Sequence, residues 1–190
     1  EILIGLVGSE MCIRDRPLPQ QFTLLVLGQG GTGLELASWA ASHLGERVAS
    51  VTVYGGASSA PTERTTALEA AGVAFVYGTE EVAGTFDICV ASPGISEFCE
   101  FFRSARAASS QIMGEPEFAW LLSPERWCAI TGTNGKTTVT SLTDELLRAS
   151  GLDSVAVGNI GNAPIHEVDR REEGCLLYTS PSPRDRSVSR

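Results

Sequence analysis

Lysine is almost absent from this sequence. Lys136 is the only lysine among the 190 residues, although lysine and arginine together number 14. This bias toward arginine indicates that Lys136 has a role for which a compact, flexible ammonium is better suited than a planar guanidinium. Lys136 lies between Gly135 and two threonines, Thr137 and Thr138, so that short stretch is where its role is to be sought.

Basic side chains in general are outnumbered. The 14 lysine and arginine residues face 23 aspartates and glutamates, which gives a formal net charge of −9. An acidic chain has no general electrostatic attraction for nucleic acid or for an anionic membrane, so neither is expected as a partner. Any phosphate group must be held by local devices, such as backbone N–H groups at the start of a helix.

Long apolar runs and cysteine pairs are also missing. No apolar stretch approaches the length of a membrane-spanning helix, and the five cysteines include no CxxC pair. Cys89 and Cys128 lie within apolar runs and are predicted to be core residues. We expect a reduced, cytoplasmic protein without a metal cluster, and a monomer.

The two ends of the chain are related at the level of DNA. One permitted set of codons for Cys175–Asp185 gives, on the opposite strand, a reading frame that encodes Val7–Asp15. The shared DNA resembles a transposase-type sequencing-library adapter. We therefore interpret residues 1–16 and 174–190 as adapter-like, non-native tails, and we expect neither to pack on the core. A genuine disordered tail at each end is the alternative.

Between these ends, short apolar runs alternate with helical patterns. Strands are predicted at 22–27, 48–54, 73–77, 86–92, 111–113 and 127–131, and helices at 34–44, 62–71, 98–105, 115–122 and 139–149. This alternation predicts an α/β fold with a mainly parallel sheet covered on both faces. A linker at SPER, which begins at Ser123, divides a first domain at 17–123 from a second at 124–173.

The first of two glycine loops is GQGGTG, Gly28–Gly33, which follows a predicted strand and opens a helix. In that context the glycines permit a tight turn and the close approach of a phosphate to the helix N-terminus. A dinucleotide site also needs an acid after the second strand, but none occurs between Glu46 and Glu63. The loop therefore favours a phosphate or diphosphate over NAD. The alternative is a tight turn that only packs the helix on the strand.

The second loop, TGTNGKT, runs from Thr131 to Thr137 between a predicted strand and a predicted helix. Strand, glycine loop, Gly-Lys-Thr and helix form an arrangement typical of phosphate binding, with the lysine near the β- and γ-phosphates and the threonine on Mg²⁺. A solvated lysine at a helix start is the alternative, and the positive end of the helix dipole disfavours it.

The form TGTNGKT resembles the ATP loop of the Mur ligases and the folylpolyglutamate synthases, which are ATP-dependent amide-forming enzymes. Four further stretches resemble the D-glutamate-adding branch of the Mur ligases in the same order: VLGQGGTG, ASPGI, GEPEF and VGNIG. The general phosphate loop has a glycine where this chain has Ile130 or Thr131. The resemblance covers nearly all of residues 22–164. It implies a Rossmann-like first domain followed by the start of a P-loop-like ATPase domain.

The resemblance also implies roles for particular residues. The expected ATP-binding residues are Gly132, Thr133, Asn134, Gly135, Lys136, Thr137 and Thr138, with Lys136 as the catalytic residue on the phosphates and Thr137 on Mg²⁺. The expected binding residues for the UDP-sugar substrate are Gly30, Gly31, Thr32 and Gly33 at the diphosphate, with Ser92 and Asn159 along the muramoyl-alanine part. Tyr54 and Gly55 stand where many relatives have an acid near the uracil.

The implied reaction is phosphoryl transfer from ATP to the alanine carboxylate of UDP-N-acetylmuramoyl-L-alanine, followed by attack of the D-glutamate amine on the acyl phosphate. Mg²⁺ and Lys136 would stabilise the charge on the transferring group. The second magnesium-binding acid, the modified lysine, the adenine contacts and the third domain of the family are expected beyond Glu173. We therefore expect a front part of the enzyme that binds substrate without turning it over.

Three other functions remain open from the sequence. A nucleotide-binding module that never catalysed ligation would have a natural stop after the central strand–helix unit, which carries the second glycine loop. An NAD-dependent oxidoreductase is opposed by the missing ribose-binding acid. Another ligase of the same superfamily, such as a folate-modifying enzyme, is opposed by the glycine loop of the first domain.

Overall fold

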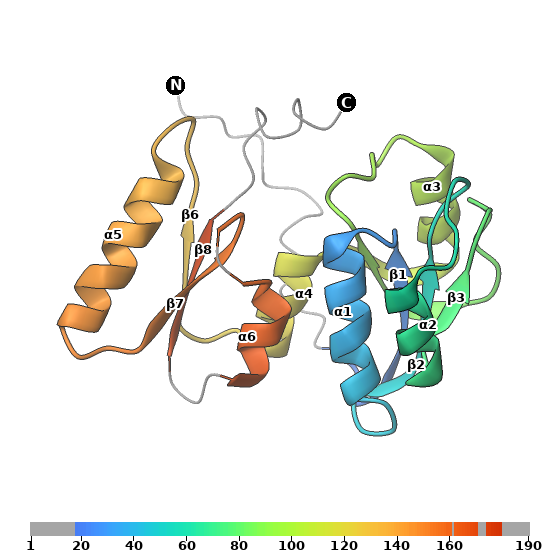
Figure 1. The fold of residues 1–190 in the computed structure, drawn as a ribbon, viewed down its shortest axis with the longest axis horizontal. Helices are drawn as coiled ribbons and strands as arrows, with labels where there is room; N and C mark the ends of the chain where they lie inside the picture. Colours follow the sequence, from blue (N-terminus) through green and yellow to red (C-terminus); the bar gives the residue numbers. More distant parts are fainter. Residues whose placement is uncertain (1–17, 161, 171–173, 180–190) are drawn as a thin grey trace.

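The computed structural model describes residues 18–160, 162–170 and 174–179. These residues form two parallel β-sheets with helices packed around and between them (Figure 1). The chain passes from the first sheet to the second after Leu122 and before Trp127.

The first sheet has five parallel strands in the order β3-β2-β1-β4-β5. Its strands are β1 (Phe22–Leu27), β2 (Val48–Tyr54), β3 (Ala74–Val76), β4 (Phe86–Ala91) and β5 (Ser109–Gly114). The predicted parallel sheet is confirmed, and its order reverses between β1 and β4, as in doubly wound sheets. The continuous apolar run of β1 suits this place because both faces of a central parallel strand are buried.

Helices cover the two faces of this sheet. On one face lie α1 (Gly31–Ser42), α2 (Glu63–Ala70) and α4 (Glu115–Leu122), and on the other lies α3 (Glu100–Ala107). Trp39 of α1 packs edge-on against Phe118 of α4, with ring centroids 5.5 Å apart. The helix predicted at 98–105 is found at Glu100–Ala107, so the inclusion of Phe98 in it is wrong. Phe98 precedes α3 and is exposed, whereas Phe101 and Ala105 are buried.

The second sheet has three parallel strands in the order β6-β8-β7. They are β6 (Trp127–Ile130), β7 (Ser154–Gly158) and β8 (Cys175–Thr179). The expectation that the chain from Gly174 onward stays off the core is wrong for residues 174–179. Strand β8 lies between β6 and β7, which do not pair with each other, so it supplies the hydrogen bonds that join the sheet. The adapter interpretation of this segment's codons stays a prediction, and residues 1–16 and 180–190 lie outside the described residues.

Helix α5 (Lys136–Ala149) has apolar residues at helical spacing, but it does not turn that side toward the sheet. Val139, Leu142 and Leu146 are 51%, 54% and 67% exposed. The other side of the helix bonds to the start of β7, where the Ser154 hydroxyl donates to a carboxylate oxygen of Asp144 at 2.6 Å. The side of α5 that bears Asp144 therefore faces the start of β7, and the apolar side is exposed.

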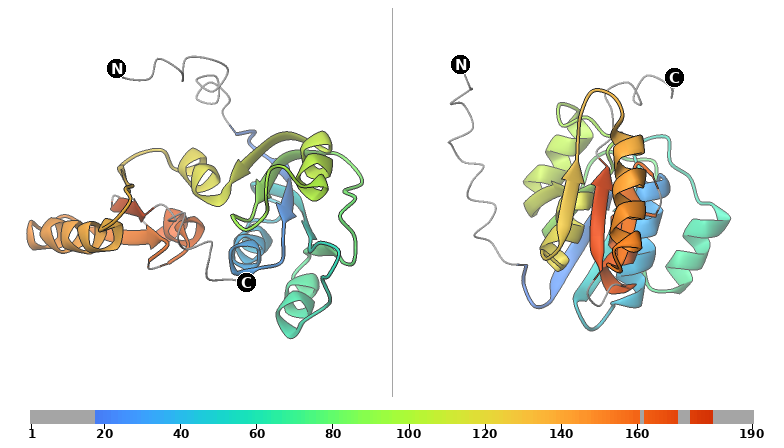
Figure 2. Two further views of the ribbon diagram at one scale, coloured as in Figure 1. Left: turned by 90° about the horizontal axis from the view of Figure 1, so that it is seen from above. Right: turned by 90° about the vertical axis from the view of Figure 1, so that its left-hand side faces the viewer.

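Helix α6 (Pro164–Arg170) lies between the two sheets, against α1 and α4 (Figures 1 and 2). Ile165 and Val168 of α6, with Val157 of β7 and Leu176 of β8, belong to the same buried cluster as Trp39. The core on this face of the first sheet is therefore continuous with the second sheet.

None of the helices among the described residues is long and apolar enough to cross a membrane. Cys89 is buried, as predicted, and burial raises the pKa of its thiol to about 12. The prediction that Cys128 is a core residue is wrong, because it is exposed on β6, a strand at the edge of the second sheet.

Candidate functional site

The first glycine loop lies at the point where the order of the first sheet reverses. The chain leaves β1 at Gly28 and leaves β4 at Ser92, so these two residues meet at the carboxyl ends of neighbouring strands. The Ser92 N–H donates to the Leu27 carbonyl at 3.0 Å, and the Gly28 N–H donates to the Tyr54 carbonyl at 2.8 Å. Open α/β sheets bind ligands at this crevice.

Two glycines of the loop are needed for packing. Gly28 has a φ of +97°, in the left-handed region, and a Cβ there would lie 3.0 Å from the Ser92 hydroxyl. A Cβ on Gly33 would lie 1.9 Å from the Gly28 carbonyl oxygen. Only glycine at position 33 lets α1 come this close to the end of β1.

The other two glycines are open. A Cβ on Gly30 or Gly31 would meet no atom within 4 Å. Helix α1 begins there without a side-chain cap and without an acidic residue in its first turn. The first N–H groups of a helix have no partner within it, and together with the helix dipole they attract an anion. The loop thus offers a diphosphate both space and donors.

Two buried polar atoms in or beside the loop have no hydrogen-bond partner among the residues that the structure describes. They are the hydroxyl oxygen of Ser92 and the amide oxygen of Gln29. The amide nitrogen of Gln29 donates to the Ala60 carbonyl at 3.1 Å, which ties the glycine loop to the segment after β2. Buried polar atoms are normally satisfied, so these two mark a place where a ligand or water would complete the bonding.

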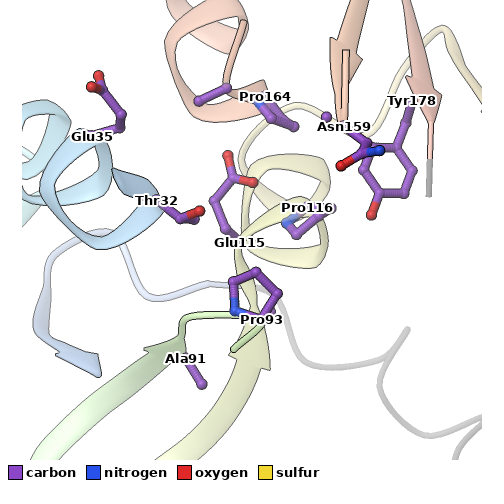
Figure 3. Close-up of a pocket in the computed structure, with 12 residues that line it drawn as sticks. Thr32, Glu35, Ala91, Pro93, Glu115, Pro116, Asn159, Pro164 and Tyr178 are labelled. Carbon is purple, nitrogen blue, oxygen red and sulfur yellow. The ribbon is translucent and has the colours of Figure 1, made fainter. Parts of the chain in front are cut away.

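A pocket of about 280 Å³ lies between the two sheets (Figure 3). Its lining includes the apolar residues Ala91, Pro93, Pro116, Ala163 and Pro164 and the polar residues Thr32, Glu35, Glu115, Asn159 and Tyr178. An apolar wall with a few convergent polar groups is typical of small-molecule sites. The pocket brings together Thr32 and Asn159, two of the predicted substrate residues, from opposite sheets.

The two carboxyl groups in this pocket have different surroundings. The Arg64 guanidinium lies 2.9 Å from one carboxylate oxygen of Glu35, and His166 Nε2 lies 2.7 Å from the other. The hydrogen bond from Arg64 is the main reason that the pKa of Glu35 lies below its ordinary value, with burial opposing it.

Glu115 is only 5% exposed, and its Oε1 accepts a hydrogen bond from the Ile165 N–H at 2.9 Å. Burial raises the pKa of Glu115 to about 7, and the Ile165 hydrogen bond offsets part of that effect. Burial, and secondarily the charge of Glu115, also raises the pKa of Tyr178.

The second glycine loop connects β6 to α5. Gly132 has a φ of +156° and Gly135 a φ of +75°, and Gly135 precedes the first helical residue, Lys136. The Lys136 residue is only 8% exposed, and its ammonium donates a part-buried hydrogen bond to the Gly132 carbonyl at 2.9 Å. Among the described residues no carboxylate pairs with it. A buried cation without a counter-charge is costly, so this arrangement favours an anionic ligand in the loop.

Thr133, Asn134, Thr137 and Thr138 lie exposed around Lys136. Within the described part of the chain no group of three or more His, Cys, Asp or Glu side chains could hold a metal ion. The exposed Thr137 hydroxyl at the start of α5 fits Mg²⁺ only together with oxygens of a bound phosphate, which suits the preference of this ion for mixed phosphate and water shells.

The sequence did not point to Glu35, Glu115 or Tyr178 as pocket residues. Glu115 lies in GEPEF, a stretch that carried the resemblance, but no role followed from it. The Gly132–Thr138 loop and Ser92 are not among the residues that line this pocket.

No family model matches the chain. Over part of its length, however, the chain is homologous to ligases of the Mur family. The relatives in question are UDP-N-acetylmuramoylalanine–D-glutamate ligases. The chain is 39% identical over 116 residues to that of Mycolicibacterium smegmatis, with 56% of this chain and 24% of the relative covered. It is 35% identical over 150 residues to that of Pelotomaculum thermopropionicum, with 77% and 32% covered. The chain thus spans at most about a third of these two relatives.

Two solved structures are also similar. One is a murein peptide ligase from Psychrobacter arcticus, with a TM-score of 0.45 and 20% identity over 84% of this chain and 38% of that one. The other is a UDP-N-acetylmuramate–alanine ligase from Thermotoga maritima, with a TM-score of 0.45 and 22% identity over 84% and 37%.

Proposed function

We propose that this chain is part of an ATP-dependent ligase that adds D-glutamate to UDP-N-acetylmuramoyl-L-alanine. The observation that carries the proposal is the uncapped, open start of α1 at Gly30 and Gly31, next to a pocket that Thr32 and Asn159 share. The homology to ligases of that name supports the choice of substrate. Such a reaction on a nucleotide-linked cell-wall precursor would run in the cytoplasm.

In this proposal the diphosphate lies at Gly30–Gly33, where N–H groups and the helix dipole balance its charge. The Ser92 hydroxyl, which has no partner among the described residues, lies beside Gly28 of this loop and would donate to the ligand. The sugar and its alanine then extend into the pocket toward Asn159, which follows β7.

ATP would lie at the loop Gly132–Thr138. The Lys136 ammonium would exchange its bond to the Gly132 carbonyl for the phosphates, and the Thr137 hydroxyl would hold Mg²⁺ jointly with them. The ends of parallel strands β6 and β7 lie at one edge of the second sheet, so this loop and Asn159 open toward the same side. The alanine carboxylate would meet the γ-phosphate there and become the acyl phosphate that the D-glutamate amine attacks.

Calorimetric titration tests the proposal directly. We expect the chain to bind UDP-N-acetylmuramoyl-L-alanine saturably and to bind NADH not at all. Saturable binding of NADH without binding of the uridine ligand would overturn the assignment and favour an oxidoreductase. Phosphate release in the presence of ATP, Mg²⁺ and D-glutamate is not expected from this chain, because the described residues include no cluster of three or more His, Cys, Asp or Glu side chains that could hold the metal ion.

The variant Lys136→Ala distinguishes the roles proposed for the two glycine loops. It should abolish MgATP binding and leave the affinity for the uridine ligand unchanged. In an enzyme with all its domains the same change should lower the rate about 10²- to 10³-fold, as for other single charge donors at a reacting centre. Lys136→Arg should restore little of the MgATP binding or of the rate, because the planar guanidinium does not replace a compact ammonium. Normal MgATP binding by Lys136→Ala would remove the role given to this lysine.

A further inference from the structure

Glu115 is the most deeply buried of the acidic groups that line the pocket. It begins α4 directly after β5, at the same edge of the first sheet as the glycine loop. Its Oε1 is occupied by the Ile165 N–H of α6, which fixes the orientation of the side chain. Figure 3 shows the carboxyl group directed into the space between Thr32 and Pro164.

The position of Glu115 lies on the path that a ligand must take. A diphosphate at Gly30 and Gly31 places the next part of its molecule beside Thr32, and the far side of the pocket is Asn159 on the other sheet. Of the other residues that line the pocket, five are alanine or proline, and besides Glu115 the polar side chains between Thr32 and Asn159 are Glu35 and Tyr178.

The chemistry of Glu115 selects the kind of ligand group that it can meet. Glu35, the other pocket carboxylate, is balanced by Arg64 and His166. Within the described residues Glu115 pairs with no cation, and its only hydrogen bond comes from a backbone N–H. A second anion beside it would be repelled, whereas an uncharged O–H or N–H donor would complete the bonding of the carboxylate.

We propose that Glu115 is a specificity-determining residue that accepts a hydrogen bond from an uncharged donor, a hydroxyl or amide N–H, of the sugar part of the ligand. This inference rests on the proposed function, because it takes the diphosphate of that ligand to lie at Gly30–Gly33. Glu115 contributes nothing to binding of the diphosphate itself, and it discriminates against nucleotides that lack the sugar.

Proton release gives a readout that a purely structural role would not produce. Burial holds the pKa of Glu115 at about 7 in the free protein, so near pH 7 the group is partly protonated. A hydrogen bond donated to the carboxylate favours its ionised form. Binding of the sugar ligand should therefore release a fraction of a proton at pH 7, and affinity should rise between pH 6 and pH 8.

The experiment is calorimetric titration of the full chain with UDP-N-acetylmuramoyl-L-alanine and, in parallel, with UDP, in buffers of different ionisation enthalpy. Glu115→Ala should lower the affinity for the sugar ligand about tenfold or more, the equivalent of one lost hydrogen bond to a charged group, with the affinity for UDP unchanged. Glu115→Gln keeps an acceptor for Ile165 and should abolish the proton release. Glu117→Gln is the matched control, since Glu117 lies two residues away in the same motif, half-buried and outside the pocket lining, and its titration should equal that of the original chain.

The outcomes separate the two proposals. Failure of the original chain to bind either ligand would overturn the proposed function. Binding of both ligands, with proton release and affinity unchanged in Glu115→Gln and Glu115→Ala, would overturn the role of Glu115 alone. Equal losses of UDP and sugar-ligand affinity in Glu115→Ala would show a structural role and would also overturn it. If Glu115→Ala does not fold, the proton release of Glu115→Gln decides.

Discussion

His166 Nε2 lies 2.7 Å from Glu35 Oε2 and so joins α6, at the side of the second sheet, to α1 of the first. A reciprocal pair lies along the same interface, where His43 Nε2 at the end of α1 is 3.3 Å from a carboxylate oxygen of Asp169 in α6. The sequence has two histidines, and both are in these pairs. Helix α6 is therefore held against α1 by two side-chain contacts, in which each helix supplies one histidine and one carboxylate.

Glu35→Gln should remove a contribution to stability that depends on pH. The pKa of Glu35 in the folded chain lies below its ordinary value of 4.5, mainly because Arg64 donates to it. The ionised group therefore stabilises the fold above about that value, and its contribution is lost as pH falls through the lower folded pKa. Because both partners are partly exposed, we expect a loss below about 1 kcal/mol at pH 7.

Urea unfolding at pH 7 and at pH 3 measures this effect. The difference between Glu35→Gln and the original chain should shrink toward pH 3. Glu46→Gln, an exposed acid in the loop after α1, serves as the control and should show no such difference. A Glu35→Gln penalty that stays the same at both pH values would show that the ion pairs add nothing.

Glu115 should make stability depend on pH in the opposite direction. Its pKa is raised from 4.5 to about 7 in the folded chain, mainly by burial. A raised value means that stability is greatest below the unfolded pKa and is lost as pH rises through the folded one, here between about 4.5 and 7. A shift of this size corresponds to an upper bound on the order of 3 kcal/mol. Glu115→Gln should therefore unfold at a higher denaturant concentration than the original chain at pH 8.

The same comparison at pH 4.5 should show little difference, because both side chains are then neutral. Glu117→Gln is again the control, since burial also raises the pKa of Glu117 but the side chain is only half-buried. A lower stability of Glu115→Gln at pH 8 would mean that the charge of Glu115 stabilises the start of α6 by more than burial costs.

Much of the first sheet could be read from the sequence, because its strands are continuous apolar runs separated by glycine-rich or helical segments. The bounds of β1 and β2, 22–27 and 48–54, agree with the predicted ones. The glycine loop was recognisable because its tight turn depends on local backbone geometry, which glycine spacing encodes.

The burial of Glu115 and the orientation of α5 could not be predicted from the sequence, because they depend on contacts between distant segments. Nothing local distinguishes Glu115 from a solvent-exposed acid, since its burial comes from α6, fifty residues away. Val139, Leu142 and Leu146 recur at helical spacing and lie on one side of α5, but that side is exposed. The hydrogen bonds that involve Ser154 join the other side of the helix to β7. Periodicity predicts that a helix has two sides, and tertiary contacts decide which side is buried.

Strand β8 provides a test of the second sheet. A chain that ends at residue 173 lacks the strand to which both β6 and β7 are bonded. It should lose the cooperative unfolding of this sheet and of α6, with a lower melting temperature and exposure of Leu176's neighbours Ile165 and Val157. A chain that ends at Ser180 retains β8 and is the matched control. Equal melting curves for the two truncated chains would support the interpretation of the whole segment as a dispensable tail.

Gly33→Ala and Gly31→Ala form a pair that separates folding from binding. An added Cβ on Gly33 would lie 1.9 Å from the Gly28 carbonyl oxygen, so α1 would have to move away from β1. We expect a loss of at least about 2 kcal/mol in the free energy of unfolding, as for other overpacked sites. Gly31→Ala adds a methyl group where no atom lies within 4 Å, and alanine is the better helix former, so stability should be unchanged or slightly higher.

The effect of Gly31→Ala should appear in ligand binding rather than in stability. The methyl group of Gly31→Ala occupies the open space in which the diphosphate would approach the N–H groups of α1, so affinity for UDP-N-acetylmuramoyl-L-alanine should fall although the chain is fully folded. Chemical denaturation and calorimetric titration of the same two variants measure both effects. A Gly31→Ala chain with normal stability and normal affinity would show that the ligand does not lie against this turn. The glycine loop would then serve only to pack α1 on β1.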